Sequence, residues 1–123
     1  MGYCIEFAHR AGTLEAVVSG KASEAYVRFI ARDIAEELTR QAAKRLLIDV
    51  RRLRNRLGSL ASLARLPARG LKPRRIAVVD LKELDRYYAF PELAMRRRGT
   101  QMRRFPDPRA AMNWLCEPTD SLS

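Results

Sequence analysis

A chain of 123 residues, of which 47% are hydrophobic, is long enough for one domain with its own core and short for two. Two cysteines are too few for the disulfide framework of a small secreted domain, and no apolar run approaches the ~20 residues of a membrane-spanning helix. The net charge of +10 is concentrated, because residues 44–75 hold 11 basic groups and one acidic group, Asp49. This concentration favours an anionic partner, although a solvated, arginine-rich surface explains it equally well.

The chain shows no basic leader followed by an apolar stretch, so we expect a cytoplasmic protein. We interpret Cys4 and Cys116 as small buried hydrophobic residues. Two cysteines and one histidine give no metal-ligand spacing, and no glycine-rich loop matches a nucleotide-binding motif, so we expect neither a metal nor a cofactor. Residues 1–116 are interpreted as one domain and residues 117–123 as a loose tail.

The first twenty residues predict a β-hairpin. Ile5 and Phe7 alternate with Glu6 and Ala8, residues 14–18 repeat this period of two, and a turn with a glycine lies between them at residues 10–13.

A long amphipathic helix is predicted next, with Ser23 as its N-cap and Glu24 in its first turn. Its apolar residues form one stripe at helical spacing that continues to Ala42. Phe29 is the exception, because it lies on the polar side of this helix. Either a loop or a partner covers it, and we favour a loop.

Two short apolar runs, at residues 45–50 and 76–80, predict central strands that are buried on both faces. Residues 51–56, directly after the first run, are too polar for a core. Gly58 and Ser59 then open a short helix that ends near Pro67.

The last third of the chain continues the alternation of helices and strands. A helix is predicted from about Lys82 to Gly99, followed by a strand at residues 101–105. Asp107 caps the final helix, which has Pro108 at its first position. Ala111, Trp114 and Leu115 share the inner face of that helix.

The resulting order, ββαβαβαβα, describes a single α/β domain with a mixed β-sheet and helices packed on it. It resembles the STAS fold of bacterial anti-sigma-factor antagonists, and more closely the SpoIIAA-like family. The matching segments are Gly20-Lys21-Ala22-Ser23, residues 46–51, residues 75–79, and Arg104-Phe105-Pro106-Asp107 with Ala111, Trp114 and Leu115.

The resemblance implies a regulatory, protein-binding domain. In its sporulation branch a serine at a helix start after the third strand is phosphorylated by a partner kinase, and Ser59 stands near that place. The sequence departs from the pattern, because Gly58 replaces the expected Asp and Leu60-Ala61 follow where a Gly is expected. An N-cap role for Ser59 is therefore favoured over phosphorylation.

No catalytic constellation is evident. His9 and Cys4 are an odd number of residues apart on one predicted strand, which places them on opposite faces. Asp49 and Asp80 end neighbouring strands and would suit acid–base chemistry, but ion pairing with Arg51 and Arg75 is the favoured interpretation.

We therefore expect a non-catalytic regulatory or protein-interaction domain that binds an acidic protein or an anionic ligand near the end of the third strand. In an open α/β sheet, ligands collect beyond the carboxyl ends of the strands. The alternative is an anion-binding module for acidic lipid headgroups or nucleic acid; nucleic acid is less favoured because no aromatic residues are interleaved with the arginines. A homodimer is left open. The expected binding residues are Arg51, Arg52, Arg54, Arg56, Gly58 and Ser59.

Overall fold

The structure is a computed structural model, and it describes residues 2–21, 24–54, 74–80 and 100–117. Within these ranges the elements follow in the order β1 (Tyr3–Arg10), β2 (Thr13–Lys21), α1 (Glu24–Gln41), β3 (Arg45–Arg54), β4 (Arg75–Val79), β5 (Gln101–Phe105) and α3 (Pro108–Leu115). The helices predicted from Gly58 and from Lys82, and the N-cap Ser23, lie outside the described residues.

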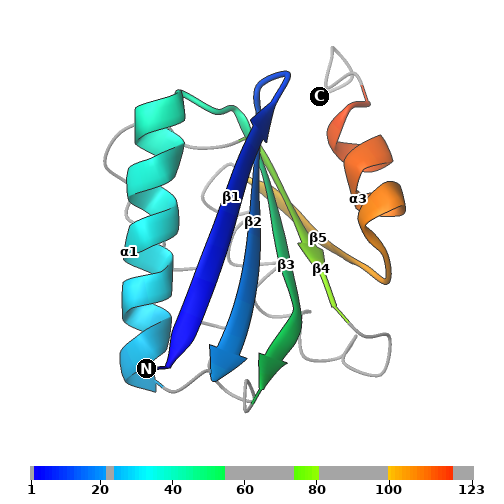
Figure 1. Cartoon of the computed structure of the whole chain (residues 1–123). Coiled ribbons are helices and arrows are strands. Elements are labelled where there is room, and N and C mark those ends of the chain that lie inside the picture. Colours follow the sequence, from blue (N-terminus) through cyan, green and yellow to red (C-terminus); the bar gives the residue numbers. More distant parts are fainter. Residues whose placement is uncertain (1, 22–23, 55–73, 81–99, 118–123) are drawn as a thin grey trace.

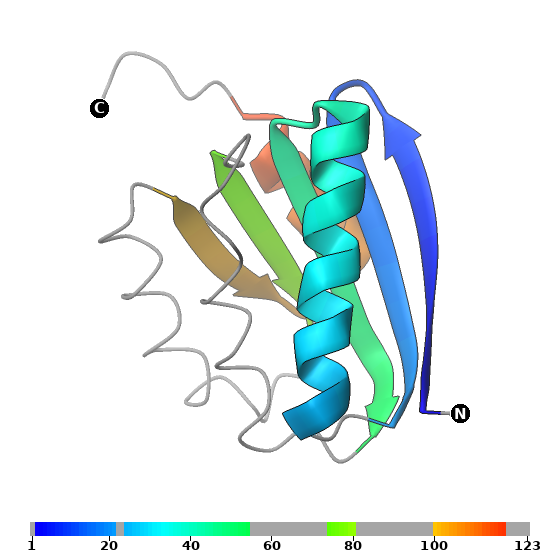
Figure 2. The same cartoon turned by 90° about the vertical axis from the view of Figure 1, so that its left-hand side faces the viewer.

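The strands form one mixed sheet in the order β1-β2-β3-β4-β5 (Figure 1). β1 is antiparallel to β2, whereas β2, β3, β4 and β5 run parallel to one another. Parallel neighbours need a crossover connection, and α1 supplies the one between β2 and β3 (Figure 2). The predicted mixed α/β domain is confirmed.

The hairpin between β1 and β2 turns at two residues, as its glycine predicted. Ala11 has φ 49° and Gly12 has φ 81°, and Arg10 pairs with Thr13 on either side. Positive φ at both central positions defines a type I′ turn, whose twist matches that of the two strands.

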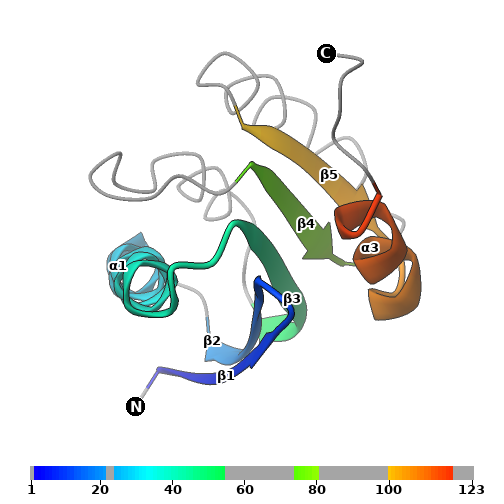
Figure 3. The ribbon, with the colours of Figure 1, turned by 90° about the horizontal axis from the view of Figure 1, so that it is seen from above.

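The sheet is covered by a helix on each face (Figure 3). Side chains alternate between the two faces along each strand. The core beneath α1 is formed mainly by Leu14, Ala16, Val18, Ile30, Ile34, Leu38, Leu46, Ile48, Val50, Ile76 and Val78. The core beneath α3 is formed by Leu47, Ala77, Val79, Ala111, Trp114 and Leu115. β3 and β4 contribute to both cores, which confirms that they are the central strands.

Hydrogen-bonded caps are present at the end of α1 and at the start of α3. The N–H of Ala43 donates to the Leu38 carbonyl (3.1 Å) and that of Ala42 to the Thr39 carbonyl (3.2 Å), with Ala42 at φ 51°. These bonds form a Schellman cap at the end of α1. At the start of α3, Asp107 accepts a hydrogen bond from the N–H of Ala110 (2.8 Å), as predicted.

Two sequence expectations about burial were wrong. Residues 51–54 do contribute to the core, because β3 continues to Arg54 and Leu53 is only 2% exposed. Cys4 and Cys116 are exposed rather than buried. Cys4 lies on the face of β1 opposite α1, and α3 packs on β3, β4 and β5, so neither helix covers that face of β1.

Candidate functional site

The carboxyl ends of the parallel strands meet at one edge of the sheet, which is the lower edge in Figure 1. Arg51, Arg52 and Arg54 end β3 at this edge, Asp80 follows β4, and Asp107 follows β5. The edge therefore carries charged residues of both signs, and the strand ends bring together residues that are far apart in the sequence.

Arg51 is held by Asp49, two residues earlier on the same face of β3. Its Nε and a terminal nitrogen donate to the two carboxylate oxygens, at 3.0 and 2.8 Å, and its backbone N–H donates at 3.1 Å. The hydrogen bond to Asp49 raises the pKa of the Arg51 guanidinium above its ordinary value, and the charge of Asp107 acts in the same direction. Arg51 is thus a fixed cation whose charge is largely balanced by its neighbours.

A register shift exposes Arg51 and Arg52 together. β3 advances three residues, from Asp49 to Arg52, while β2 advances two, from Val17 to Ser19. In a regular strand, one of two successive residues would face the core. The extra residue leaves both arginines exposed and returns Leu53 to the core. Within the described part of the chain, the side chain of Arg52 has neither a hydrogen bond nor an ion pair.

The remaining candidate residues are placed only in part. Arg54 is the last residue of β3 and pairs with Lys21 of β2. Arg56, Gly58 and Ser59 lie outside the described residues. Their convergence with Arg52 stays a prediction.

The two carboxylates considered for acid–base chemistry do not face each other. Asp49 pairs with Val79, so Asp80 lies one residue further along and falls on the opposite face of the sheet. Asp49 is bound by Arg51, as predicted. The pairing expected for Arg75 was wrong, because Arg75 begins β4 and both aspartates lie at the ends of parallel strands.

The basic segment is divided between the two edges of the sheet. Lys44, Arg45, Arg74 and Arg75 lie at the amino edge, opposite the arginines at the end of β3. Arg45 is engaged internally, since it donates to the Thr13 hydroxyl (3.2 Å) and to the Ala11 carbonyl (2.6 Å). The basic residues of this segment that the structure describes therefore lie at both ends of the strands and not in one patch.

Cys4 and His9 lie on opposite faces of β1. Cys4 pairs with Ser19 and His9 with Leu14, so the alternation of β1 keeps their side chains on opposite faces. The described ranges contain no cluster of three or more His, Cys, Asp or Glu residues that could hold a metal ion. Neither α1 nor α3 is long and apolar enough to cross a membrane.

A cluster of arginines around Trp114 was not predicted from the sequence. The guanidinium carbons of Arg75 and Arg103 lie 4.9 and 5.6 Å from the centroid of the indole ring. Arg75 also donates to the Trp114 carbonyl and to Gln101 (3.1 Å). The alternation of Gln101, Arg103 and Phe105 along β5 was the available signal, because it places all three on the face that α3 covers.

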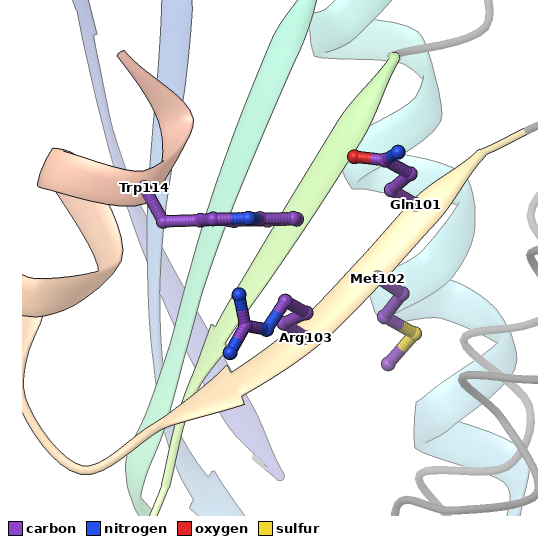
Figure 4. Close-up of a pocket in the computed structure, with 4 residues that line it drawn as sticks. All are labelled: Gln101, Met102, Arg103 and Trp114. Carbon is purple, nitrogen blue, oxygen red and sulfur yellow. The ribbon is translucent and has the colours of Figure 1, made fainter. Parts of the chain in front are cut away.

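A pocket of about 440 Å³ adjoins this cluster at the outer edge of β5. Figure 4 shows Trp114 reaching from α3 toward β5, with Arg103 beside it and Met102 on the other side of the strand. A cation beside an aromatic ring suits an anionic or a planar group. Arg75 and Trp114 are nevertheless largely buried, so their first role is to hold α3 on the sheet.

Solved structures share the overall fold of this chain. An anti-sigma factor antagonist from Mycobacterium paratuberculosis superposes with a TM-score of 0.65 and 15% sequence identity, over 94% of this chain and 96% of that chain. An uncharacterized protein with a SpoIIAA-like fold from Shewanella loihica superposes with a TM-score of 0.53 and 21% identity, over 94% of each chain. No protein-family model and no curated protein matches the sequence.

The fold class follows from these superpositions. The chain is a mixed α/β domain with a SpoIIAA-like fold, which confirms the fold implied by the sequence resemblance. At these identities, the likeness concerns the fold and not the residues at the end of β3.

Proposed function

We propose that this chain is a non-catalytic regulatory domain that binds an acidic protein, or another anionic ligand, at the carboxyl end of β3. The fold supports the regulatory part, because one similar structure is that of an anti-sigma factor antagonist. The separation of Asp49 from Asp80, and of Cys4 from His9, supports a binding role over a catalytic one.

The exposed arginine pair at the register shift carries the proposal. Arg52 is free to pair with a carboxylate or phosphate, while Asp49 keeps the neighbouring Arg51 in a fixed orientation. A positioned guanidinium loses less conformational entropy on binding and can form two parallel hydrogen bonds to an oxyanion. In this proposal Arg54, Arg56, Gly58 and Ser59 extend the surface, and a phosphate on Ser59 is one anion that it would accept.

A charge-reversal experiment tests the surface. The full chain is used to capture its partner from a native lysate, the partner is identified by mass spectrometry, and binding is then measured with purified proteins. The double variant Arg52→Glu with Arg54→Glu should weaken binding by roughly tenfold or more, because two attractive contacts become repulsive. The matched control is Lys44→Glu with Arg74→Glu, which makes the same change in net charge at the opposite edge of the sheet.

Equal loss in both double variants would show that overall charge, rather than the end of β3, drives the binding. The dependence of binding on salt concentration distinguishes a nucleic-acid ligand from an acidic protein. Binding to duplex DNA should weaken with a log–log slope of about −0.9 for each phosphate contact, whereas a packed protein interface loses much less.

A further inference from the structure

The first strand, β1, is an edge strand. Its outer side forms a lateral edge of the sheet, distinct from the amino and carboxyl edges where the strands begin and end. Among the described residues, β1 has a strand neighbour on one side only, and α1 lies beside it (Figure 1). The Gly2 carbonyl accepts a hydrogen bond from the N–H of Lys21 (2.6 Å), and in an antiparallel pair such bonded positions recur at every second residue. The intervening residues Tyr3, Ile5 and Phe7 therefore direct their backbone N–H and C=O groups away from β2.

A groove of about 380 Å³ runs along this edge, between β1 and α1. One wall is formed by residues 3–5 and Phe7 of β1, and the other by the polar side of α1. The lining residues from α1 are Asp33, Glu36, Glu37 and Arg40. The same groove thus offers apolar surface, unpaired backbone groups on β1 and carboxylates.

Among the described residues, the groove side of β1 lacks the usual protection against pairing. Natural edge strands are commonly guarded by lysine, proline or inward-pointing charge. On the groove side of β1, however, the successive residues are Tyr3, Ile5, Phe7 and His9, and Phe7 is 38% exposed. This is a surface that a further strand can extend.

The charge of the groove indicates what kind of strand fits. Its lining has three carboxylates and one arginine, in a chain whose net charge is +10. Arg40 pairs with Glu37 (3.0 Å), and Asp33 accepts from the Tyr3 hydroxyl (2.8 Å) and pairs with Arg32 (3.5 Å). Glu36 is exposed and has no ion pair within the described residues. A second copy of this chain would bring the same carboxylates against one another, whereas a basic segment would complement them.

We propose that β1 and α1 form a docking groove for an extended, basic segment of a partner protein, which adds as a strand to the edge of β1. Main-chain hydrogen bonds to Tyr3, Ile5 and Phe7 supply binding energy, and lysines or arginines at alternate positions of the segment reach Glu36 and its neighbours. This groove is separate from the surface at the end of β3, and the two proposals fail independently.

Synthetic peptides test the proposal on the full chain. The probe is a short peptide in which lysine alternates with valine, and calorimetry measures its Kd. One control peptide has glutamate in place of lysine, and another has proline in place of valine. We expect only the lysine–valine peptide to bind, and backbone NMR shifts to change along β1. Binding of all three, or no binding of the lysine–valine peptide, would overturn the proposal.

Charge reversal locates the binding. Glu36→Lys should weaken the binding of the lysine–valine peptide roughly tenfold, because an attraction becomes a repulsion. The control Glu6→Lys makes the same change in charge on the opposite face of β1 and should leave the Kd nearly unchanged. Equal loss in the two variants would contradict the groove.

A proline tests the backbone contribution. Phe7→Pro removes one outward N–H and spares the bonds between β1 and β2, and Phe7→Ala controls for the lost ring. The proline variant should bind about fivefold more weakly than the alanine variant, which is the effect of one hydrogen bond. Circular dichroism checks that both fold. A wild-type dimer that Phe7→Pro converts to a monomer, with no peptide binding, would assign the edge to a second copy and refute the proposal.

Discussion

Trp114 joins α3 to the sheet through both its ring and its backbone. Trp114 is 6% exposed, and the centroid of its ring lies 5.5 Å from that of Phe105. Its backbone carbonyl accepts a hydrogen bond from Arg75. Arg75 in turn comes from the start of β4 and contacts Gln101 of β5. One residue thus connects a helix and two strands, and its removal affects all of these contacts.

Trp114→Ala should lower the free energy of unfolding by roughly 3–5 kcal/mol, as expected for loss of a buried large aromatic side chain. Urea denaturation measures the change. The neighbouring Asn113 is exposed, so Asn113→Ala should stay within about 0.5 kcal/mol of the wild type. An unchanged midpoint for Trp114→Ala would mean that α3 is not docked through its indole ring.

Tyr3 links the edge strand to α1 through its hydroxyl group. Burial raises the pKa of the Tyr3 phenol above its ordinary value of 10.0, and the hydrogen bond to Asp33 acts in the same direction. A pKa that is higher in the folded state stabilises the fold below the unfolded value, and this contribution is lost as the pH rises through the folded value.

Tyr3→Phe should therefore cost about 1 kcal/mol at neutral pH, the usual net value of a hydrogen bond. Above about pH 10 the difference from the wild type should shrink, because the wild-type protein loses this contribution there. Chemical denaturation at a series of pH values measures both effects. A constant difference across the alkaline range would exclude the linkage.

At the scale of elements, the end of α1 contains a residue that suits its conformation poorly. Ala42 occupies the left-handed position of the Schellman cap, at φ 51°, where glycine has no steric penalty. The two cap hydrogen bonds maintain this conformation against the preference of alanine. A glycine would keep the bonds and relieve the strain.

Ala42→Gly should raise the free energy of unfolding by up to about 1 kcal/mol, and thermal melting measures the gain. The same substitution at Ala35, in the middle of α1, should lower it by about 1 kcal/mol, because glycine is unfavourable inside a helix. Opposite signs at the two positions are the expected result. Destabilisation at both would show that the cap does not form in solution.

At the scale of the whole molecule, local sequence patterns predicted the strands and helices, whereas tertiary contacts decided the burial of particular residues in them. The period of two, the glycine turn and the Asp107 cap act within a few residues, and each was predicted correctly. The exposure of Cys4 depends on which strands α3 covers, and the burial of Leu53 depends on a shift in pairing with β2. Neither has a signal in the surrounding sequence.

The candidate site shows the same division. The position of the arginines at the end of β3 follows from strand polarity and charge, whereas the exposure of both Arg51 and Arg52 depends on the shift in pairing with β2. The salt bridge between Asp49 and Arg51 also follows from spacing, since residues two apart share a face of a strand. The groove beside β1 could not be predicted, because it joins the polar side of α1 to a strand some thirty residues away, a contact that only the folded chain creates.

The two-residue turn at Ala11 and Gly12 also bears on the order in which the chain assembles. Hairpins with such short loops close in roughly 1–10 μs, whereas parallel strands must wait for long loops to close. β1 and β2 can therefore pair before α1 brings β3 alongside. The early hairpin gives β3 a preformed edge to join, and the sheet then grows in one direction, toward β5. On this route β1 and β2 are the first strands to pair, and the outer edge of β1 is available from the start.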